Sequence, residues 1–157
     1  MSTRVLFVCM GNICRSPAGE GILDQQARKV GLDLHVDSAG THDYHVGGPA
    51  NATMRKIAAA RGYSLTSIAR QVTEADLRPG CFDLVLAMDR DNLSILRSMQ
   101  GGQSSHVRLF SDFTGDDWPT DVPDPYYGGE DGFGYVIDMI EAGCPALIEH
   151  LRQGSED

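Results

Sequence analysis

The 157-residue chain is short of positive charge. It carries 13 Lys and Arg residues against 22 Asp and Glu residues, which gives a formal net charge of −9 at pH 7. Nucleic acids and anionic membrane surfaces bind proteins through basic faces, so this balance argues against both as partners. The same surface repels anionic substrates unless one local site reverses the field.

Cysteine is also scarce, with four residues and no C-x-x-C pair. Cys9, Cys14, Cys81 and Cys144 are too few and too scattered for a disulfide scaffold, and a chain of this length can build its own core. We therefore expect reduced thiols and a cytoplasmic protein. The histidines show no zinc-like spacing with these cysteines, so we expect no metal site.

Long hydrophobic runs are missing as well. The apolar segment Val5–Val8 near the start is too brief for a signal peptide or a membrane span. We find no repeat, linker or low-complexity tract, and the length fits one domain over residues 1–157.

What the chain does contain is an alternation of short β-branched runs with longer helical patterns. Strands are expected over residues 5–8, 34–38, 83–88 and 107–110. Helices are expected over residues 16–30, 49–61, 89–99 and 132–152, with a short one from residue 73 and a long loop over 111–131. Strands separated by helices imply βαβ units, so the pattern predicts an α/β fold with three α/β/α layers around a four-stranded parallel sheet.

Cap residues mark several helix ends. Ser16-Pro17 predicts a helix start, with the serine as N-cap and the proline at the first helical position. Thr73 and Asp76 match a capping box with Asp in place of Glu, and Asp89 can cap the next helix. Pro145 lies inside the last helical pattern and predicts a kink.

The most unusual residues follow the first strand. They form a C-x5-R-S motif, Cys9-Met10-Gly11-Asn12-Ile13-Cys14-Arg15-Ser16. Ligands of such sheets bind beyond the carboxyl ends of the strands. A loop of this length that ends at a helix N-terminus can turn the N–H groups of residues 10–16 inward and bind a phosphate. Gly11 and Asn12 suit the loop because both tolerate left-handed backbone conformations.

The side chains of this loop supply the chemistry. Arg15 offers a planar, bidentate clamp for phosphate oxygens. The same positive field favours the thiolate form of Cys9, which makes it a nucleophile, and the Ser16 hydroxyl is placed to stabilise the sulfur as it leaves. The competing interpretation is a small buried cysteine and a surface arginine, since a bare C-x5-R also arises by chance.

Residues Val5–Pro17, VLFVCMGNICRSP, closely resemble the active-site signature of the low-molecular-weight protein tyrosine phosphatases. The resemblance covers nearly the whole chain and implies the family's α/β fold, with strand order 2-1-3-4. Four further motifs follow in the family's order: Asp37-Ser38-Ala39-Gly40-Thr41, Ala69-Arg70-Gln71-Val72-Thr73, Ala87-Met88-Asp89-x-x-Asn92-Leu93 and Val122-Pro123-Asp124-Pro125-Tyr126-Tyr127.

The resemblance also implies a two-step hydrolysis of phosphotyrosine monoesters on proteins by a monomer, without metal or cofactor. Cys9 attacks the phosphorus and forms a phosphocysteine, which water hydrolyses to release inorganic phosphate. Arg15 and the loop amides hold the phosphate oxygens, and Asp124 matches the family's general acid. Asp124 is one of 22 acidic residues, so its assignment depends on the match to the Asp-Pro-Tyr-Tyr motif.

Several supporting residues follow from the resemblance. Asn12 and Ser38 match positions that shape the loop and tune the nucleophile, although ordinary turn chemistry explains them equally well. Asp89 resembles an acid of the family, and helix capping is its alternative role. Ser67 stands where many relatives carry a histidine, so we expect weaker or rearranged support there.

Aromatic residues resemble the wall of the family's substrate slot. Tyr44, Tyr126 and Tyr127 would stack against a phosphotyrosine ring, with plain packing as the alternative. Met10 and Ile13 are expected to border the same opening.

Two of the cysteines form a candidate redox pair. Cys14 lies five residues from Cys9 in the same loop, close enough to condense with an oxidised Cys9 and form a disulfide. We hypothesise reversible redox inactivation on this basis. Cys81 and Cys144 are expected to be structural.

Two other functions fit parts of the sequence. A thiol-dependent arsenate reductase uses the same scaffold but needs resolving cysteines downstream, and none occurs between Cys81 and Cys144. A non-catalytic phosphate-binding module would have lost its nucleophile, arginine or acid, whereas Cys9, Arg15 and Asp124 are all present.

Overall fold

Four parallel strands form the centre of the molecule. The computed structural model describes residues 2–126 and 129–156. Strand β1 (Thr3–Cys9) lies between β2 (Leu34–Gly40) and β3 (Leu84–Ala87), and β4 (Val107–Leu109) pairs with β3 at the edge. The sheet order is β2-β1-β3-β4, which confirms the expected parallel sheet and strand order.

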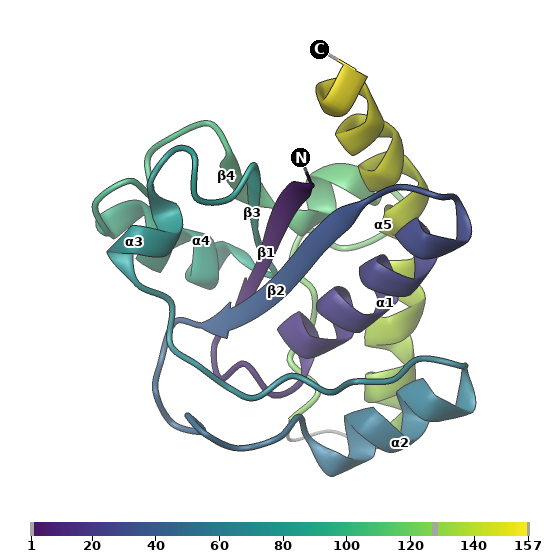
Figure 1. Cartoon of the computed structure of the whole chain (residues 1–157). Helices are drawn as coiled ribbons and strands as arrows, with labels where there is room; N and C mark the ends of the chain where they lie inside the picture. The colour runs from purple at the N-terminus through teal and green to yellow at the C-terminus, as the bar shows by residue number, and fades with distance from the viewer. Residues whose placement is uncertain (1, 127–128, 157) are drawn as a thin grey trace.

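Helices cover both faces of this sheet (Figure 1), which confirms the three-layer α/β/α fold. On one side, α1 packs on β1 and β2, and α5 packs on α1 and α2. The other side carries α3 and α4. The bounds are α1 (Arg15–Lys29), α2 (Ala52–Ala60), α3 (Glu74–Leu77), α4 (Arg90–Ser98) and α5 (Glu130–Glu156), and a 3-10 turn, η1 (Phe110–Phe113), follows β4.

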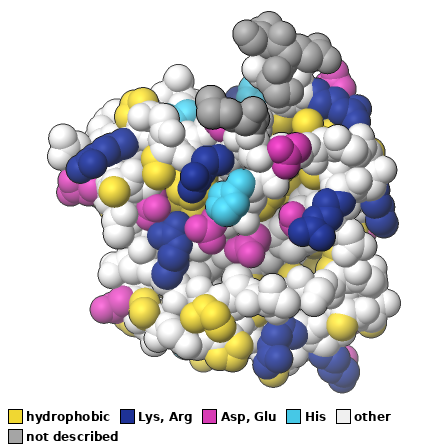
Figure 2. Space-filling view, in the orientation of Figure 1, with side chains coloured by type: hydrophobic (Ala, Val, Ile, Leu, Met, Phe, Trp, Pro, Cys, Tyr) yellow, Lys and Arg dark blue, Asp and Glu magenta, His cyan; other side chains and the backbone are white. Residues whose placement is uncertain are grey.

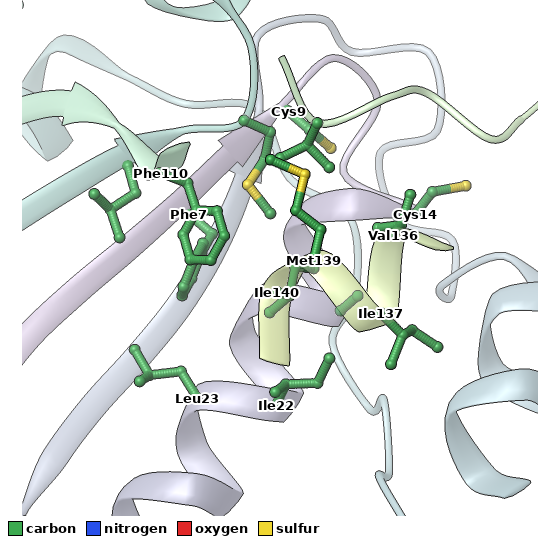
Figure 3. Close-up of a cluster of buried hydrophobic side chains, with 14 of the residues drawn as sticks. Phe7, Cys9, Cys14, Ile22, Leu23, Phe110, Val136, Ile137, Met139 and Ile140 are labelled. Carbon is green, nitrogen blue, oxygen red and sulfur yellow. The ribbon is translucent and has the colours of Figure 1, made fainter. Parts of the chain in front are cut away.

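The core has two parts because the side chains of β1 alternate between the faces. Phe7 lies among side chains from α1 and α5, as Figure 3 shows for Ile22 and its neighbours. The Phe7 ring centroid is 5.9 Å from that of Phe110. On the opposite face, Leu6 packs in the cluster that contains Leu96 of α4. A strand buried on both faces explains the continuous apolar run near the N-terminus.

The start of α1 differs from the prediction. Its N-cap is Cys14 rather than Ser16, and Cys14 makes no side-chain capping bond. The Ser16 hydroxyl instead lies 3.0 Å from Cys9 Sγ and accepts a hydrogen bond from Asn12 Nδ2 at 2.8 Å. The first backbone N–H groups of α1 are therefore left without a side-chain cap at the carboxyl edge of β1.

Other boundaries also shift. β1 and β2 extend to Cys9 and Gly40, and α2 starts after an Asn51 cap rather than at Pro49. β3 and β4 are shorter than expected, η1 occupies the start of the predicted loop over 111–131, and α5 is longer at both ends than the predicted helix over 132–152.

Two predicted caps are confirmed. Thr73 and Asp76 form the capping box of α3, and the Asp89 carboxylate accepts the Asn92 N–H at the start of α4. Helix α5 continues through Pro145, and the kink expected there stays a prediction.

The surface over β2 carries mixed charge. Figure 2 shows basic and acidic side chains interspersed across this face, with hydrophobic side chains gathered toward its lower edge, over the loops that follow β2 and α2. Tyr44, Val46 and Ile68 are exposed apolar residues of those loops. Within the described ranges, no helix is long and apolar enough to cross a membrane.

The packing of α1 on β1 can be tested by a substitution at Gly19. A β-carbon at Gly19 would lie 2.6 Å from the Phe7 ring. Replacing a helical glycine with alanine normally stabilises a helix by about 0.5–1 kcal/mol, whereas overpacking a core costs about 1–3 kcal/mol. We expect Gly19→Ala to lower the free energy of unfolding in urea by about 1–2 kcal/mol.

The control is Gly154→Ala, at a helical glycine of α5 that has open space around the added carbon. It should leave the free energy of unfolding unchanged or raise it slightly. A Gly19→Ala protein as stable as the parent would contradict the packing described for α1 on β1.

Candidate active site

The loop between β1 and α1 lies at the carboxyl edge of the sheet, where β1 is flanked by β2 and β3. Cys9 at the end of β1 pairs with Gly40, and Val8 pairs with Ala87. Asp89 follows β3 directly. Three segments that are distant in the sequence therefore meet around Cys9.

Asn12 sets the curl of this loop. Among the described residues it is the one non-glycine with a positive φ, 59°, a conformation that asparagine tolerates better than most residues. Its side chain donates to Ser16 Oγ at 2.8 Å and accepts the Arg70 N–H at 3.0 Å. The predicted left-handed conformation is thus present, and the Asn12 side chain joins Ser16 to the Arg70 backbone.

Two glycines, Gly11 and Gly40, lie so close to neighbouring atoms that an added β-carbon would crowd them. Gly11 does not adopt the left-handed conformation expected of it; a β-carbon there would instead meet the His45 ring at 3.0 Å. A β-carbon on Gly40 would lie 2.8 Å from the Met10 carbonyl oxygen. The absence of a side chain at Gly40 lets the loop lie directly over the end of β2.

Cys9 is buried, with a relative exposure of 2%. Its sulfur lies 3.0 Å from Ser16 Oγ and accepts the Ser16 N–H at 3.5 Å. Both partners lie in the first turn of α1, where the helix dipole is positive. The start of α1 therefore faces the Cys9 sulfur.

Arg15 is 3% exposed and held from two sides. Its Nη1 donates to Asp89 Oδ2 at 2.5 Å and to the Val122 carbonyl at 3.1 Å. Burial alone would lower the pKa of Arg15, but Cys9 and Asp89 outweigh it and raise the pKa above its ordinary value. Asp89 both caps α4 and anchors Arg15, so the two roles predicted as alternatives coexist.

Asp124 approaches the same guanidinium. Its Oδ2 lies 3.6 Å from Arg15 Nη2, and its Oδ1 accepts the Tyr126 N–H at 3.0 Å. Asp124, Arg15 and Cys9 all line one cavity of about 260 Å³. The structure thus brings together the three residues that the sequence singles out as catalytic.

The walls of the cavity are mainly apolar and aromatic. Tyr44, Tyr126, Met10 and Ile13 line it as expected, and Tyr127 lies outside the described residues. Tyr44 and Tyr126 are 66% and 42% exposed, so neither is ordinary core packing.

His45 is a lining residue that the sequence reasoning missed. Its ring centroid is 5.9 Å from that of Tyr126, and it lies against Gly11. Its position in the sequence, about 30 residues beyond the loop, carries no signal of this contact.

Ser38 and Ser67, which were also expected to bear on the support of the loop, differ from Asn12 in their hydrogen bonds. Ser38 donates its hydroxyl to Glu20 at 2.7 Å rather than to the loop. The Ser67 hydroxyl is buried and meets no hydrogen-bond partner in the described part of the chain.

The remaining cysteines are free thiols. Burial, followed by the charges of Cys9 and Asp124, raises the pKa of Cys14 to about 12. Burial also raises the pKa of Cys144 to about 12, which agrees with a structural role for this residue. Cys81 packs at the edge of the core that faces α3 and α4.

Comparison with known proteins decides between the readings of the motif. A family model described as low molecular weight phosphotyrosine protein phosphatase matches residues 4–156. The chain belongs to this family. It is accordingly a protein-tyrosine phosphatase, as the sequence motifs predict.

Relatives of this phosphatase match along almost their whole length. It is 45% identical over 152 residues to a putative low molecular weight protein-tyrosine-phosphatase of Synechocystis, covering 94% of this chain and 96% of the relative. It is 42% identical to YfkJ of Bacillus subtilis, covering 95% and 96%. A crystal structure of protein tyrosine phosphatase from Entamoeba histolytica with Hepes in the active site superposes with a TM-score of 0.90 at 43% identity, covering 98% and 99%.

The close approach at Gly40 generates a test of the phosphatase loop. Gly40→Ala would push the Met10 carbonyl away, because real β-carbons do not approach an oxygen to 2.8 Å. A displacement of the loop by about 1 Å can cost about 100-fold in catalysis. We expect kcat/KM for p-nitrophenyl phosphate to fall by about that factor. Gly154→Ala serves as the control, and unchanged kcat/KM in Gly40→Ala would contradict the tight fit.

Proposed function

We propose that this phosphatase hydrolyses phosphotyrosine monoesters on proteins through a phosphocysteine at Cys9. The observation that carries the proposal is the convergence of Cys9, Arg15 and Asp124 on one cavity beside the uncapped start of α1. A nucleophile, a cation and an acid in one site are the parts that phosphoryl transfer needs.

In the first step, Cys9 sulfur attacks the phosphorus in line with the ester oxygen. The S–P bond forms as the O–P bond breaks, and Asp124 gives its proton to the departing phenol oxygen. Arg15 and the backbone N–H groups of residues 10–16 hold the other phosphate oxygens. Proton donation matters because phenols have a pKa of about 10 and leave poorly as anions at neutral pH.

In the second step, water attacks the phosphocysteine. Asp124, now a carboxylate, takes a proton from the water, and the P–S bond breaks with its electron pair returning to Cys9. The Ser16 hydroxyl, 3.0 Å from the sulfur, and the Ser16 N–H stabilise the thiolate that leaves. Inorganic phosphate is released and the enzyme is restored. Neither step uses a metal or a cofactor.

Phosphate binding in this acidic protein depends on local dipoles. Asp89 offsets part of the charge of Arg15, since the two are 2.5 Å apart. The N–H groups at the start of α1 must therefore supply much of the remaining attraction. Asp89 also fixes the guanidinium in one orientation, which preserves its fork for the phosphate oxygens.

The cavity walls favour an aromatic substrate. The aromatic side chains of Tyr44 and Tyr126 line it, and Met10 and Ile13 add apolar surface. Such walls fit a phenyl ring better than a short aliphatic side chain.

We also propose that the enzyme acts as a cytoplasmic monomer, without nucleic-acid or membrane partners, since its four thiols are free and its net charge is −9.

Replacement of the nucleophile tests the reaction class. Hydrolysis of p-nitrophenyl phosphate in excess EDTA should proceed in the parent and be lost in Cys9→Ser, because the serine hydroxyl stays protonated where the thiol ionises. Cys81→Ser is the matched control and should retain full activity. Equal rates in the parent and Cys9→Ser would sink the proposal, and thioredoxin-coupled arsenate reduction would favour the reductase alternative.

The acid is tested through the leaving group. Asp124→Asn should lower kcat/KM, which reports the first step alone, for a phosphotyrosine peptide by about 10²- to 10⁴-fold. The loss should be smaller for p-nitrophenyl phosphate, because its more acidic phenol needs less protonation. Asp121→Asn, which removes an exposed ion pair with Arg90 in the same segment, is the control. Equal losses for both substrates would argue against Asp124 as the acid.

Cys14 is proposed to protect Cys9 from oxidation. Peroxide converts the Cys9 thiolate to a sulfenic acid; the Cys14 thiol then attacks this sulfur, the S–S bond forms and water leaves. Part of the rise in the pKa of Cys14 comes from the charge of Cys9. Burial is the larger cause and persists on oxidation, but loss of the Cys9 charge removes one of the causes that raise the pKa of Cys14.

Recovery of activity tests this protection. Peroxide-inactivated parent should regain most of its activity with dithiothreitol, whereas Cys14→Ser should regain little because Cys9 proceeds to the sulfinic acid. Cys81→Ser is again the control and should recover like the parent. A parent enzyme that regains nothing, or a Cys14→Ser enzyme that recovers fully, would exclude the protective disulfide.

A further inference from the structure

The Asn12 side chain is hydrogen-bonded to a segment that lies outside the β1–α1 loop. Residues 69–72, between α2 and α3, run alongside the end of β2 and beneath the β1–α1 loop (Figure 1). The Arg70 carbonyl accepts the Gly40 N–H at 2.8 Å, and its own N–H donates to Asn12 Oδ1 at 3.0 Å. The backbone of one residue, Arg70, thus joins the sheet edge to the loop that surrounds Cys9.

The side chain of the same residue is clamped by two carboxylates. Arg70 Nη1 and Nη2 donate to the two Asp76 oxygens at 2.9 and 3.2 Å, and Nη2 also donates to Asp37 Oδ2 at 3.1 Å. Asp37 belongs to β2 and Asp76 to α3. The bidentate pair fixes both the position and the plane of the guanidinium.

Asp76 is itself held in place. It accepts the Thr73 N–H at 2.8 Å as part of the capping box of α3. Burial opposes its ionisation, but the hydrogen bonds from Arg70 and Thr73 outweigh burial and lower the pKa of Asp76. The carboxylate is therefore charged and oriented toward Arg70 at neutral pH.

We propose that the Asp37–Arg70–Asp76 cluster is a positioning device for the nucleophile. The cluster fixes the Arg70 peptide, whose N–H holds Asn12 in its left-handed conformation; Asn12 Nδ2 then orients the Ser16 hydroxyl, which faces the Cys9 sulfur. Each link is a hydrogen bond of 2.8–3.2 Å, and the last contact is 3.0 Å. The inference rests on the proposed role of Cys9 as nucleophile.

Arg70→Met tests the device because it removes both ion pairs and keeps the aliphatic stem. A misplaced Ser16 hydroxyl should stabilise the thiolate less, so the pH midpoint of Cys9 alkylation by iodoacetamide should move upward. We expect kcat/KM for p-nitrophenyl phosphate to fall by about 10- to 100-fold, mainly through kcat. Asp76→Asn should change both readouts in the same direction by less, and Arg70→Lys should restore them in part.

The control is Arg61→Met. Arg61 has the same side-chain exposure as Arg70, 34%, and also pairs with two carboxylates, Asp138 and Glu141, on α5. It should leave the alkylation midpoint and kcat/KM unchanged. If Arg70→Met fails to fold, Asp76→Asn and Asp37→Asn carry the test.

Unchanged alkylation and turnover in the cluster variants would overturn the inference, as would equal changes in Arg61→Met. Alkylation reports the state of the thiol without any turnover. A failure of the proposed phosphatase mechanism, seen as activity that survives Cys9→Ser, is therefore distinguishable from a failure of the positioning device.

Discussion

The β1–α1 loop turns through a left-handed residue, and the hydrogen bonds of one side chain hold that turn. Asn12 adopts a φ of 59° and bonds on both sides, to Ser16 Oγ and to the Arg70 N–H. These bonds hold the turn that places Ser16 at the Cys9 sulfur. The nucleophile, the phosphate cradle and the missing cap of α1 all depend on this geometry.

The surrounding elements make the geometry rigid. Gly40 lets the loop lie against β2, and Asp89 on the other side of β1 fixes Arg15 while capping α4. A site supported from β2, β3 and α1 at once has little freedom to adjust. In the proposed mechanism, this rigidity lets fixed dipoles and one arginine bind phosphate in a protein with a net charge of −9.

Local patterns predicted the fold and the residues that meet in the cavity, because the strand–helix alternation and the C-x5-R-S motif are written in consecutive residues. The start of α1 was mispredicted since Ser16 normally caps a helix, whereas here its hydroxyl serves Cys9. His45 and the ion pairs of Arg70 reach the site through the folding of distant segments. Ser38 matched a motif, but its partner Glu20 depends on side-chain packing that a motif does not encode.

The central claim is that phosphoryl transfer passes through Cys9. The most direct test mixes Asp124→Asn protein with excess p-nitrophenyl phosphate, stops the reaction with a denaturing quench and measures the mass of the protein and its peptides. Loss of the base slows hydrolysis of the intermediate, so the intermediate accumulates. The account predicts one added phosphoryl group on the peptide that contains Cys9, and none when Cys9→Ser is added to the same variant. Turnover without a phosphoryl group on Cys9, or with the group on another residue, would contradict it.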